Sequence, residues 1–441
     1  MGIKVCKFGG SSVADGIQLN KIKEIIKSDE QRKYIVVSAP GKRFDGDNKI
    51  TDLLYLVKSH IDNNLPYEQI FQVICDRYTA VQANLGLKID MTQYYDEIKR
   101  NLAANPSKDY IASRGEYLNA VLIAAYLGFD FVDAEGLILF DKSGKLRLEE
   151  TFACLGSALS MHKNAVIPGF YGTLPDGRIK TFSRGGSDIT GSLVAGAVKA
   201  DCYENWTDVS GFLMADPRIV DNPKQIRNIS YKELRELSYM GASVLHEDAI
   251  YPARVMNVPI NIRNTNDTND EGTTIRSEEE IYSGKENERI ITGIAGSKDF
   301  TVIALYKNMM SSEKGFVRRI LGILDDYNIN FEHLPSGIDT ISVVMANSQI
   351  DGRLDEIVQE FESRLRPDSI DVFEDIALIA TVGHGMSSRC GTSATLFGAL
   401  ADAGVNIRMI DQGSSEMNII VGVENKDFEK AIRAIYGAFE E

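Results

Sequence analysis

Cysteine, histidine and positive charge are all scarce in this chain of 441 residues, and each scarcity argues against a class of protein. The five cysteines are widely spaced, and none belongs to a C-x-x-C pair. That pattern argues against a disulfide framework or a zinc site and fits a reducing cytoplasm. The five histidines are scattered without the spacing of metal ligands. We therefore expect no metal site built by the protein itself.

Acidic residues outnumber basic ones. The chain has 48 lysines and arginines against 63 aspartates and glutamates, which gives a formal charge of −15. With this balance there is no general positive field for polyanions, so we expect neither nucleic acid nor an anionic membrane as a partner. A phosphate-bearing substrate would need a locally basic pocket, which gives weight to individual lysines and arginines.

Long apolar runs are also missing. No run approaches the roughly 18 apolar residues of a membrane span, and residues 1–30 contain no apolar segment of a signal peptide. Hydrophobic residues make up 44% and charged residues 25% of the chain, which is the composition of a soluble globular protein. The length suffices for two or three domains, and we expect a cytoplasmic protein.

From Ile3 to about Thr274, strand-like and helix-like segments alternate. The clearest helix lies between Ile70 and Leu85, where apolar residues recur at the helical period. Strands are expected at Tyr34–Ser38, Phe129–Asp133, Ala165–Pro168, Ile179–Phe182, Cys202–Trp206 and Val258–Ile262. This alternation predicts an α/β domain with a largely parallel sheet that is covered by helices.

A polar stretch at Asn264 to Asn269 and an acidic one at Ser277 to Glu280 indicate a linker. Beyond it, one order of elements occurs twice, in units of roughly seventy residues. Strands are expected at Thr301–Tyr306, Ile329–His333, Thr340–Met345, Ala377–Val382, Val405–Ile410 and Met417–Val423, and helices at Gly315–Tyr327, Leu354–Leu365, Thr392–Ala403 and Phe428–Tyr436. Two βαββ-type units of this size suit small-molecule sensing or pairing rather than catalysis.

The first candidate site is the segment Lys7-Phe8-Gly9-Gly10-Ser11-Ser12, directly after the strand-like run Ile3 to Val5. Glycines let the backbone approach an anion, a helix N-terminus favours negative charge, and a lysine can reach terminal phosphates. Ligands of parallel sheets sit at the carboxyl ends of strands, where this segment would lie. It is either a phosphate site or an ordinary strand-to-helix turn.

A second segment, Ser183-Arg184-Gly185-Gly186-Ser187-Asp188, also follows a strand and precedes a helix. Arg184 offers a planar fork for a carboxylate or a phosphate. Ser187 and Asp188 could be merely the cap and the dipole partner of the helix. Capping does not explain the arginine and the two glycines ahead of them.

Two further segments have both a structural and a functional interpretation. Ser113-Arg114-Gly115-Glu116 has the form of a capping box, but Glu116 could instead receive a substrate ammonium. Thr207-Asp208, with Asp216-Pro217-Arg218 shortly after, could cradle the ribose and phosphates of a nucleotide, or the second part could be a turn with a solvated charge.

A third glycine segment, Gly383-His384-Gly385-Met386-Ser387-Ser388, nearly matches a dinucleotide fingerprint. Ser388 stands where the third glycine belongs, and too few residues follow to complete a dinucleotide-binding domain. We reject that interpretation.

Taken together and in order, the segments at Lys7–Val13, Ser113–Glu116, Ser183–Asp188 and Thr207–Arg218 resemble the aspartate kinases of the amino acid kinase family. The C-terminal part is similar to the paired ACT domains of that family, especially at Val382–Met386 and Asn406–Ile410. The resemblance covers essentially the whole chain. No homoserine dehydrogenase extension follows, so a monofunctional enzyme is expected.

The resemblance implies a three-layer αβα kinase domain with a mainly parallel sheet, followed by two βαββαβ ACT-type domains. It places the catalytic domain at 1–275, a linker at 276–296, and the ACT domains at 297–375 and 376–441. It also implies a homodimer or homotetramer assembled through the ACT domains.

The implied reaction is the phosphorylation of the β-carboxylate of L-aspartate by Mg-ATP to 4-phospho-L-aspartate. This is the first step of lysine, threonine and methionine biosynthesis, including the diaminopimelate route. Residues matching the family's catalytic set are Lys7, Arg184 and Asp188. Those matching its ATP site are Lys7, Gly9, Gly10, Ser11, Thr207, Asp208, Leu213 and Arg218, and those matching its aspartate site are Ser38, Thr51, Glu116, Arg184 and Ser187.

ACT pairs of this family bind an end-product amino acid, and we expect L-lysine as an inhibitor, with Glu332 as a candidate partner of its ammonium. The matching effector residues are Met309, Ser311, Ser312, Gly315, Phe316, Phe331, Glu332 and Ser336. Met309, Met310 and Phe316 could instead be core residues of the domain.

The sequence departs from the family pattern in places. Ser243 stands where a nucleotide-side lysine is common, Glu247 where proline is usual, and Leu213 where tyrosine is common. The segment Lys42 to Lys49 lengthens the connection before Thr51, which puts the loop carrying Thr51 in doubt. Two alternatives remain, a related kinase acting on glutamate, acetylglutamate or a nucleoside monophosphate, and a non-catalytic amino-acid sensor.

Overall fold

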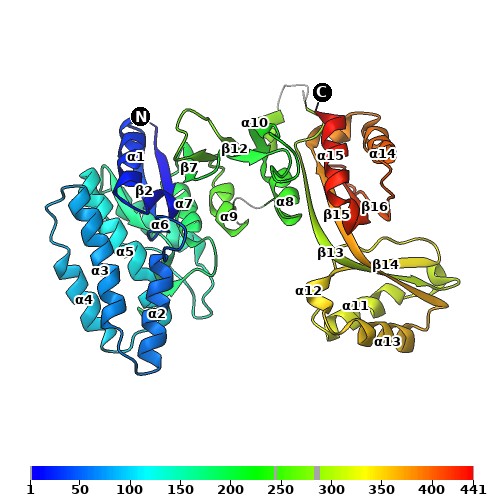
Figure 1. The fold of residues 1–441 in the computed structure, drawn as a ribbon, viewed down its shortest axis with the longest axis horizontal. Coiled ribbons are helices and arrows are strands. Elements are labelled where there is room, and N and C mark those ends of the chain that lie inside the picture. Colours follow the sequence, from blue (N-terminus) through cyan, green and yellow to red (C-terminus); the bar gives the residue numbers. More distant parts are fainter. Residues whose placement is uncertain (1, 243–244, 246, 283–288, 441) are drawn as a thin grey trace. The chain divides into compact units, whose positions relative to one another are not determined.

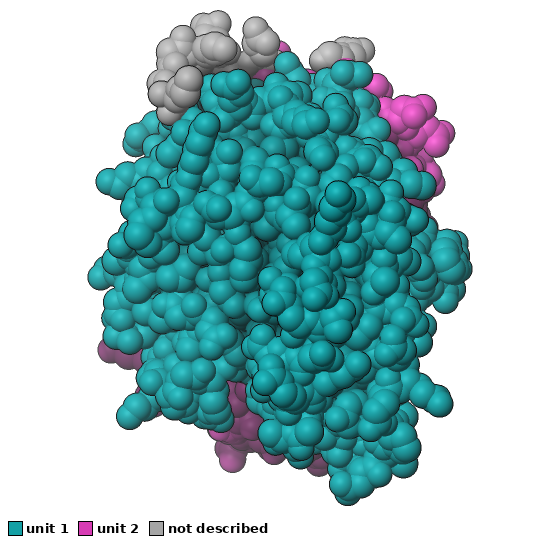
Figure 2. Space-filling model, turned by 90° about the vertical axis from the view of Figure 1, so that its left-hand side faces the viewer, with its two compact units in different colours: residues 1–212, 225–231, 244–283 teal, residues 213–224, 232–243, 284–441 magenta. Residues whose placement is uncertain are grey.

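The computed structural model describes residues 2–242, 245, 247–282 and 289–440. Contacts divide the chain into two compact units, coloured separately in Figure 2. The first unit comprises residues 1–212, 225–231 and 244–283, and the second comprises residues 213–224, 232–243 and 284–441. Each unit has its own sheet (Figure 1).

The first unit alternates strands and helices along the chain. Its helices are α1 (Gly16–Lys27), α2 (Ile50–Asp62), α3 (Glu68–Asn84), α4 (Thr92–Leu102), α5 (Lys108–Leu127), α6 (Leu148–Leu159), α7 (Gly186–Ala197), α9 (Glu247–Val255) and α10 (Glu278–Tyr282). Its strands are β1 (Lys4–Phe8), β2 (Arg32–Val37), β3 (Asp130–Phe131), β4 (Ala165–Pro168), β5 (Tyr171–Thr173), β6 (Ile179–Thr181), β7 (Cys202–Thr207), β9 (Gln225–Ile226), β10 (Asn228–Ser230), β11 (Ile260–Asn264) and β12 (Thr273–Arg276). The short strand β8 (Phe212–Leu213), at the boundary of the units, pairs with β9.

An eight-stranded sheet forms the centre of this unit, in the order β10-β12-β11-β7-β1-β2-β4-β3. Among the strand pairs of this sheet in the described residues, only β11 and β12 run antiparallel. The predicted mainly parallel sheet is therefore confirmed. The N-terminal strand β1 is central, between β2 and β7.

Helices cover both faces of the sheet. Side chains alternate along β1, and Cys6 and Phe8 join the apolar core formed with helices α1 to α5. Lys7 points to the other face, where α7 lies against β1, β2 and β7. The three-layer arrangement follows from this alternation, because both faces of each central strand are buried.

One sequence-based expectation for this unit was wrong, and two need refinement. The strand expected at Ile179–Phe182 is present as β6, but it lies outside the main sheet, because the chain turns tightly through Gly177 and β6 pairs with β5 as a hairpin. The polar stretch after Asn264 is a turn rather than a linker, since the chain returns as β12 antiparallel to β11. The strand expected at Phe129–Asp133 is present only as the two-residue β3.

The second unit contains α8 (Tyr231–Tyr239, whose first residue belongs to the first unit), β13 (Gly293–Tyr306), α11 (Phe316–Asp326), β14 (Thr340–Ala346), α12 (Asn347–Ile350), α13 (Leu354–Leu365), β15 (Ser369–Val382), α14 (Thr392–Asp402), β16 (Met409–Asp411), β17 (Asn418–Glu424) and α15 (Phe428–Phe439). Its five-stranded sheet is antiparallel, in the order β14-β13-β15-β17-β16. The repeated order of strands and helices expected for two ACT-type domains is present, except at two of the predicted strands, which are shorter or absent.

Two long strands run through both repeats. The second half of β13, Phe300–Tyr306, pairs with β14, whereas its first half pairs with the second half of β15. That second half of β15, Ile376–Val382, also pairs with β17. Register shifts near Ser297 and Phe300 mark the change from one repeat to the other. The repeats are therefore built on shared strands.

Two strands predicted here are shorter or absent. Ile329–His333 forms no ladder, and the structure has only isolated bridges at His333 and Ser336, on either side of Pro335, which lacks an N–H donor. The strand expected at Val405–Ile410 begins only at Met409, because the Val405 N–H is used to close helix α14 on the Leu400 carbonyl.

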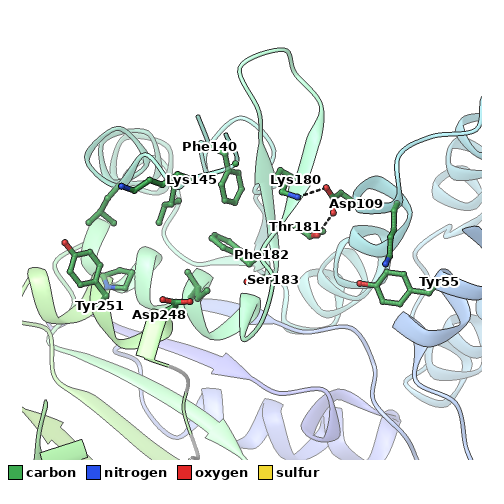
Figure 3. Close-up of a pocket in the computed structure, with 16 residues that line it drawn as sticks. Tyr55, Asp109, Phe140, Lys145, Lys180, Thr181, Phe182, Ser183, Asp248 and Tyr251 are labelled. Atoms are coloured by element: carbon green, nitrogen blue, oxygen red, sulfur yellow. Dashed lines mark hydrogen bonds and ion pairs between the residues drawn. The ribbon is translucent and has the colours of Figure 1, made fainter. Parts of the chain in front are cut away.

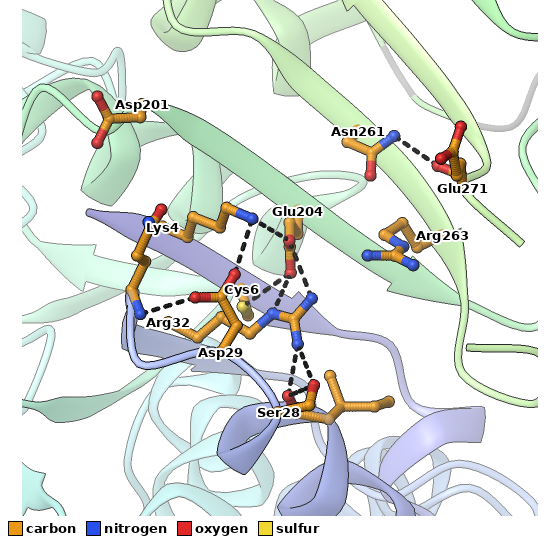
Figure 4. Close-up of polar contacts among 12 residues, drawn as sticks. Lys4, Cys6, Ser28, Asp29, Arg32, Asp201, Glu204, Asn261, Arg263 and Glu271 are labelled. Carbon is orange, nitrogen blue, oxygen red and sulfur yellow. Dashed lines mark hydrogen bonds and ion pairs between the residues drawn. The ribbon is translucent and has the colours of Figure 1, made fainter. Parts of the chain in front are cut away.

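A buried carboxylate joins three neighbouring strands on the α1 side of the main sheet (Figure 4). Glu204 on β7 is 2% exposed and accepts hydrogen bonds from Arg32 Nε at 2.7 Å and Trp206 Nε1 at 3.0 Å. Lys4 Nζ on β1 lies 3.5 Å from the same carboxylate. Arg32 also donates to the Ile25 carbonyl, which ties the end of α1 to the network.

The ion pair keeps this carboxylate charged despite its burial. Burial acts to raise the pKa of Glu204, but the hydrogen bonds and charges of Arg32 and Lys4 lower it below its usual value. Burial likewise acts to lower the pKa of Arg32, and Glu204 raises it. The stability that Glu204 supplies is therefore present above the unfolded-state pKa of about 4.5 and is lost as the pH falls.

Removing one partner of this pair leaves the other charge buried and alone. We expect Glu204→Ala to lower the free energy of unfolding of the first unit by about 3–5 kcal/mol. Urea unfolding followed by the fluorescence of Trp206, the single tryptophan, measures this. Asp176→Ala, which removes an exposed pair with Arg178, is the control and should leave the midpoint unchanged. Equal midpoints for the two variants would contradict the assignment.

Candidate active site

Lys7 is the buried cation at the carboxyl end of β1. Its side chain is 8% exposed, and Nζ lies 2.6 Å from Asp188 Oδ1 in the first turn of α7. Lys7 and Asp188 come from segments far apart in the sequence, and the packing of α7 on β1 brings them together. Two of the three residues that match the family's catalytic set are thus in contact.

The glycine segment after β1 is held by backbone contacts. Gly9 N–H donates to the Trp206 carbonyl at 3.1 Å, and Gly41 N–H donates to the Gly10 carbonyl at 2.8 Å. A Cβ on Gly41 would come within 2.7 Å of the Gly10 carbonyl carbon, so only glycine fits there. Sequence analysis missed Gly41, although its place directly after Pro40 marks a turn at the end of β2.

The two serines of that segment differ. Ser12 is buried, and its Oγ lies 2.8 Å from Thr265 Oγ1. Ser11 is exposed at the start of a short 3-10 helix, Ser11–Val13, and the long helix α1 begins only after Asp15, its N-cap. Of the pair, Ser11 is the one accessible to a ligand.

Glu116 is a buried carboxyl in the middle of α5, not part of a helix cap. The helix begins at Lys108, and its cap is Ser107, whose Oγ accepts from Tyr110 N–H at 3.1 Å. The capping-box interpretation of Ser113 and Glu116 was therefore wrong. Glu116 is 5% exposed, its Oε2 has no hydrogen-bond partner, and burial raises its pKa to about 8. A cation placed beside it would be strongly favoured.

Arg114, in the same motif, has a structural role that sequence analysis missed. Its guanidinium lies 4.6 Å from the ring centres of Tyr110 and Tyr117 and 5.3 Å from that of Tyr171. It also donates to Ser113 Oγ. These cation–π contacts fasten α5 to β5. The spacing of Tyr110 and Tyr117 around position 114, four before and three after, is the signal that could have indicated them.

The second glycine segment leads into α7. The helix begins at Gly186, and Gly185 precedes it in the left-handed conformation, with φ of 57°. Ser187 is thus inside the helix and buried, and its interpretation as the N-cap was wrong. Arg184 is exposed and has no charged partner among the described residues, so its fork is available to an anion.

Ser38, directly after β2, and Thr51, in α2, are both held in place by their surroundings. Ser38 N–H donates to the Phe8 carbonyl at 3.2 Å, and Asn119 Nδ2 donates to the Ser38 carbonyl at 2.7 Å. Thr51 is in the first turn of α2 rather than in a loop. Buried Arg77 fixes the lengthened connection before it, with hydrogen bonds to the carbonyls of Gly41 and Asn48.

The residues predicted to contact the nucleotide belong to different units of the chain. Thr207 ends β7, and its Oγ1 donates to Asp208 Oδ1 at 3.1 Å in the first unit. In the second unit, Arg218 is exposed, and its main-chain N–H and guanidinium both donate to the Asp216 carboxylate, which is the turn expected as one of the two alternatives. Leu213, 37% exposed, ends β8. Ser243 lies outside the described residues, as does the side chain of Glu247.

A cavity of about 660 Å³ adjoins the Arg184 segment in the first unit (Figure 3). Residues lining it include Tyr55, Asp109, Phe140, Lys145, Lys180, Thr181, Phe182, Ser183, Asp248 and Tyr251. Asp109, at the start of α5, accepts from Thr181 Oγ1 at 2.6 Å and pairs with Lys180 at 3.2 Å. These contacts join the helix of Glu116 to the hairpin that leads into Arg184.

The expected effector segment lies on the first repeat of the second unit. Met309 is 71% exposed, in a left-handed backbone conformation with φ of 58°, whereas Met310 and Phe316 are core residues. The expectation that these residues belong to the domain core is therefore correct for Met310 and Phe316 and wrong for Met309. Ser311, Ser312, Gly315, Phe331 and Ser336 are exposed. Glu332 Oε2 accepts from Tyr239 Oη at 2.5 Å.

Metal-ligand clusters and membrane-spanning helices are both absent from the described residues. No group of three or more histidines, cysteines, aspartates or glutamates there is arranged to hold a metal ion. None of the helices in the described part of the chain has the length and apolar character that crossing a membrane requires.

Comparison with known proteins gives close matches along the whole chain. The profile of the amino acid kinase family matches residues 2–264, and that of an ACT domain matches residues 379–439. Aspartokinase 3 of Bacillus subtilis is 38% identical, with 99% of this chain and 98% of that protein aligned. The crystal structure of an aspartate kinase from Clostridium acetobutylicum is similar over 100% of both chains, with 52% identity and a TM-score of 0.92.

Aspartokinase III of Escherichia coli is a more distant relative that has been solved in two states. Its complex with aspartate and ADP matches over 100% of both chains at 25% identity and a TM-score of 0.73. Its complex with lysine and aspartate matches equally fully at 25% identity and a TM-score of 0.72. With a family profile over more than half of its length and a full-length relative at 38% identity, the chain belongs to the amino acid kinase family, in its aspartokinase branch.

Proposed function

We propose that the chain is an ATP-dependent kinase of the L-aspartate β-carboxylate, acting in the cytoplasm and regulated by an amino acid through its ACT domains. The observation that carries this is the pairing of buried Lys7 with Asp188 beside a glycine segment held for close approach, in a chain of the aspartokinase branch. We further propose a catalytic domain at 1–275, a linker at 276–296, and ACT domains at 297–375 and 376–441.

The phosphoryl end of the reaction belongs to β1 and α7. Lys7 neutralises the charge that develops on the transferring phosphoryl group, and Asp188 orients it. The N–H groups of Gly10 and Ser11 face the phosphates, and Mg²⁺ enters with ATP as part of the substrate. Because a carboxylate is already nucleophilic, catalysis needs positioning and charge neutralisation rather than a general base.

The aspartate end of the site combines two contrasting groups. Arg184, exposed and without a charged partner in the described chain, holds the α-carboxylate. Glu116, buried and unpartnered at Oε2, receives the α-ammonium. Ser38, Thr51 and Ser187 complete the pocket. Thr207, Asp208, Leu213 and Arg218 contact the nucleotide.

Loss of the catalytic cation is the direct test. We expect Lys7→Ala to lower kcat for aspartate-dependent ADP release by about 10²- to 10³-fold. Lys27→Ala, at an exposed lysine of α1, is the matched control and should retain full activity. An active Lys7→Ala variant would contradict the mechanism. If the parent enzyme released ADP with glutamate, acetylglutamate or a nucleoside monophosphate instead of aspartate, a related kinase would be favoured. If it released no ADP with any of these acceptors, a non-catalytic sensor would be favoured.

The buried Glu116 predicts a pH dependence of aspartate binding. Below its pKa of about 8 the free enzyme holds Glu116 protonated, whereas the substrate ammonium requires the carboxylate, so binding at neutral pH releases a proton. We expect the KM for aspartate to fall as the pH rises from about 6 to 8, by up to about tenfold per pH unit. Steady-state kinetics across this range measure it.

The KM for ATP, which does not involve Glu116, is the internal control and should stay nearly constant. Glu116→Gln should weaken aspartate binding and remove the pH dependence. Between about pH 4.5 and 8, the folded state still holds the proton on Glu116, whereas the unfolded chain has lost it. Glu116 therefore makes the fold less stable as the pH rises through this range. A flat KM for aspartate in the parent enzyme would refute the assignment.

We propose L-lysine as the effector and a homodimer or homotetramer formed through the ACT domains as the assembly. A full-length relative from E. coli, 27% identical by sequence alignment, is a lysine-sensitive aspartokinase. Of the predicted effector residues, Phe331 lines a cavity of about 520 Å³ between α11 and the segment at Asn330 and Phe331. Glu332 stands beside that segment and offers a carboxylate to an ammonium. Met309, Ser311, Ser312, Gly315, Phe331 and Ser336 complete the proposed site, whereas Phe316 belongs to the core.

Inhibition assays with lysine, threonine and both decide the effector. We expect lysine to inhibit, and Glu332→Gln to raise the lysine concentration for half-inhibition about tenfold or more, relative to the variant's own uninhibited rate. Glu356→Gln is the matched control, since Glu356 also accepts a tyrosine hydroxyl, that of Tyr327, on the same repeat. No response of the parent to either amino acid would refute this regulation.

A further inference from the structure

The centre of β7 has a buried polar side chain that none of the assignments above uses. Asn205 is 4% exposed and is the register partner of Lys7 on the neighbouring strand β1. A buried amide is unfavourable unless it is hydrogen-bonded. Its Nδ2 donates to Asp188 Oδ1 at 2.8 Å, and Lys7 Nζ lies 2.6 Å from that same oxygen. Two donors from adjacent strands thus meet on one carboxylate oxygen.

This geometry fixes the carboxylate more tightly than one partner could. Rotation about the terminal torsion of an aspartate is soft, so a single contact with a flexible lysine leaves both side chains free to move together. The amide of Asn205 stands on a rigid central strand and removes that freedom. As a neutral donor, it does so without adding a second positive charge beside Lys7.

The start of α7 is held at a second point from the same strand. Tyr203, two residues before Asn205 and on the same face of β7, donates its hydroxyl to the main-chain carbonyl of Asp188 at 3.1 Å. Tyr203 therefore contacts the backbone of Asp188, and Asn205 contacts its carboxylate. The two contacts can be removed separately, which distinguishes support of the helix from orientation of the charged group.

We propose that Asn205 is a positioning residue for phosphoryl transfer. It holds the Asp188 carboxylate and, through it, the Lys7 ammonium at the place where the phosphoryl group is transferred. This rests on the proposed function, in which Lys7 neutralises the transition state. A cation displaced by a fraction of an ångström stabilises that state less while the substrates still bind, so the contribution of Asn205 lies in kcat rather than in KM.

The first test compares two variants of β7. We expect Asn205→Ala to lower kcat by about 10- to 100-fold with less than about a threefold change in the KM for ATP and for aspartate. Tyr203→Phe, which removes only the contact with the Asp188 main chain, is the matched control and should keep kcat within about threefold of the parent. The double variant Asn205→Ala, Asp188→Asn should be no slower than Asp188→Asn alone, because both substitutions disrupt the same interaction between Asn205 and the Asp188 carboxylate.

The second test uses a variant of equal size. Asn205→Asp places a carboxyl beside Asp188, and the two groups share one proton only while the pH is low enough. With the proton the introduced carboxyl can donate to Asp188, and without it the two repel. The kcat of Asn205→Asp should therefore fall steeply with rising pH over a range in which the parent's kcat changes little. This variant decides the question should Asn205→Ala fail to fold.

The outcomes separate this proposal from the function on which it rests. A kcat within about twofold of the parent for Asn205→Ala, an equal loss in Tyr203→Phe, or the parent's pH profile in Asn205→Asp would overturn the role of Asn205 while Lys7→Ala remains inactive. Failure of the proposed function has a different signature, because the parent itself would then show no aspartate-dependent ADP release.

Discussion

A carboxylate inside a parallel sheet stays ionised only if cations come to it, and Glu204 draws Arg32 from β2 and Lys4 from β1. The side chains of this network link the three central strands at one level. That alignment has its effect on the opposite face of the same strands, where β1 presents Lys7 and β7 presents Asn205 to one oxygen of Asp188. Because side chains alternate along a strand, β7 presents Glu204 to the network on one face and Asn205 to the proposed catalytic pair of Lys7 and Asp188 on the other.

The proposed recognition of aspartate depends on a contrast between two residues whose elements are fastened to each other. Glu116 is deep in α5 and short of partners, whereas Arg184 is exposed on the segment before α7. Asp109 joins the start of α5 to Thr181, three residues before Arg184, and Arg114 fastens the same helix to Tyr171 on the hairpin. The two groups proposed to bind the ends of the aspartate are thus carried by elements that are fastened to each other, although they come from separate parts of the chain.

The α/β fold of the first unit could be predicted from the sequence, because the alternation of strand and helix patterns is a local signal. The glycine segments at Lys7 and Arg184 could be recognised for the same reason, since each is a short run of neighbouring residues. The start of the helix around Glu116 was misplaced because a capping box is a short pattern that also occurs inside helices. The actual N-cap of α5 is Ser107, six residues earlier than Ser113. Asn205, Gly41 and the tyrosines around Arg114 were missed because their importance depends on residues brought near only by the fold, in the case of Asn205 by the pairing of β7 with β1.

The shared strands of the second unit have a consequence for how such a protein can be divided. Since β13 and β15 each supply one half to either repeat, a cut between the repeats leaves both with broken sheets and exposed edges. The two repeats therefore have to be truncated, expressed or exchanged together, as one piece.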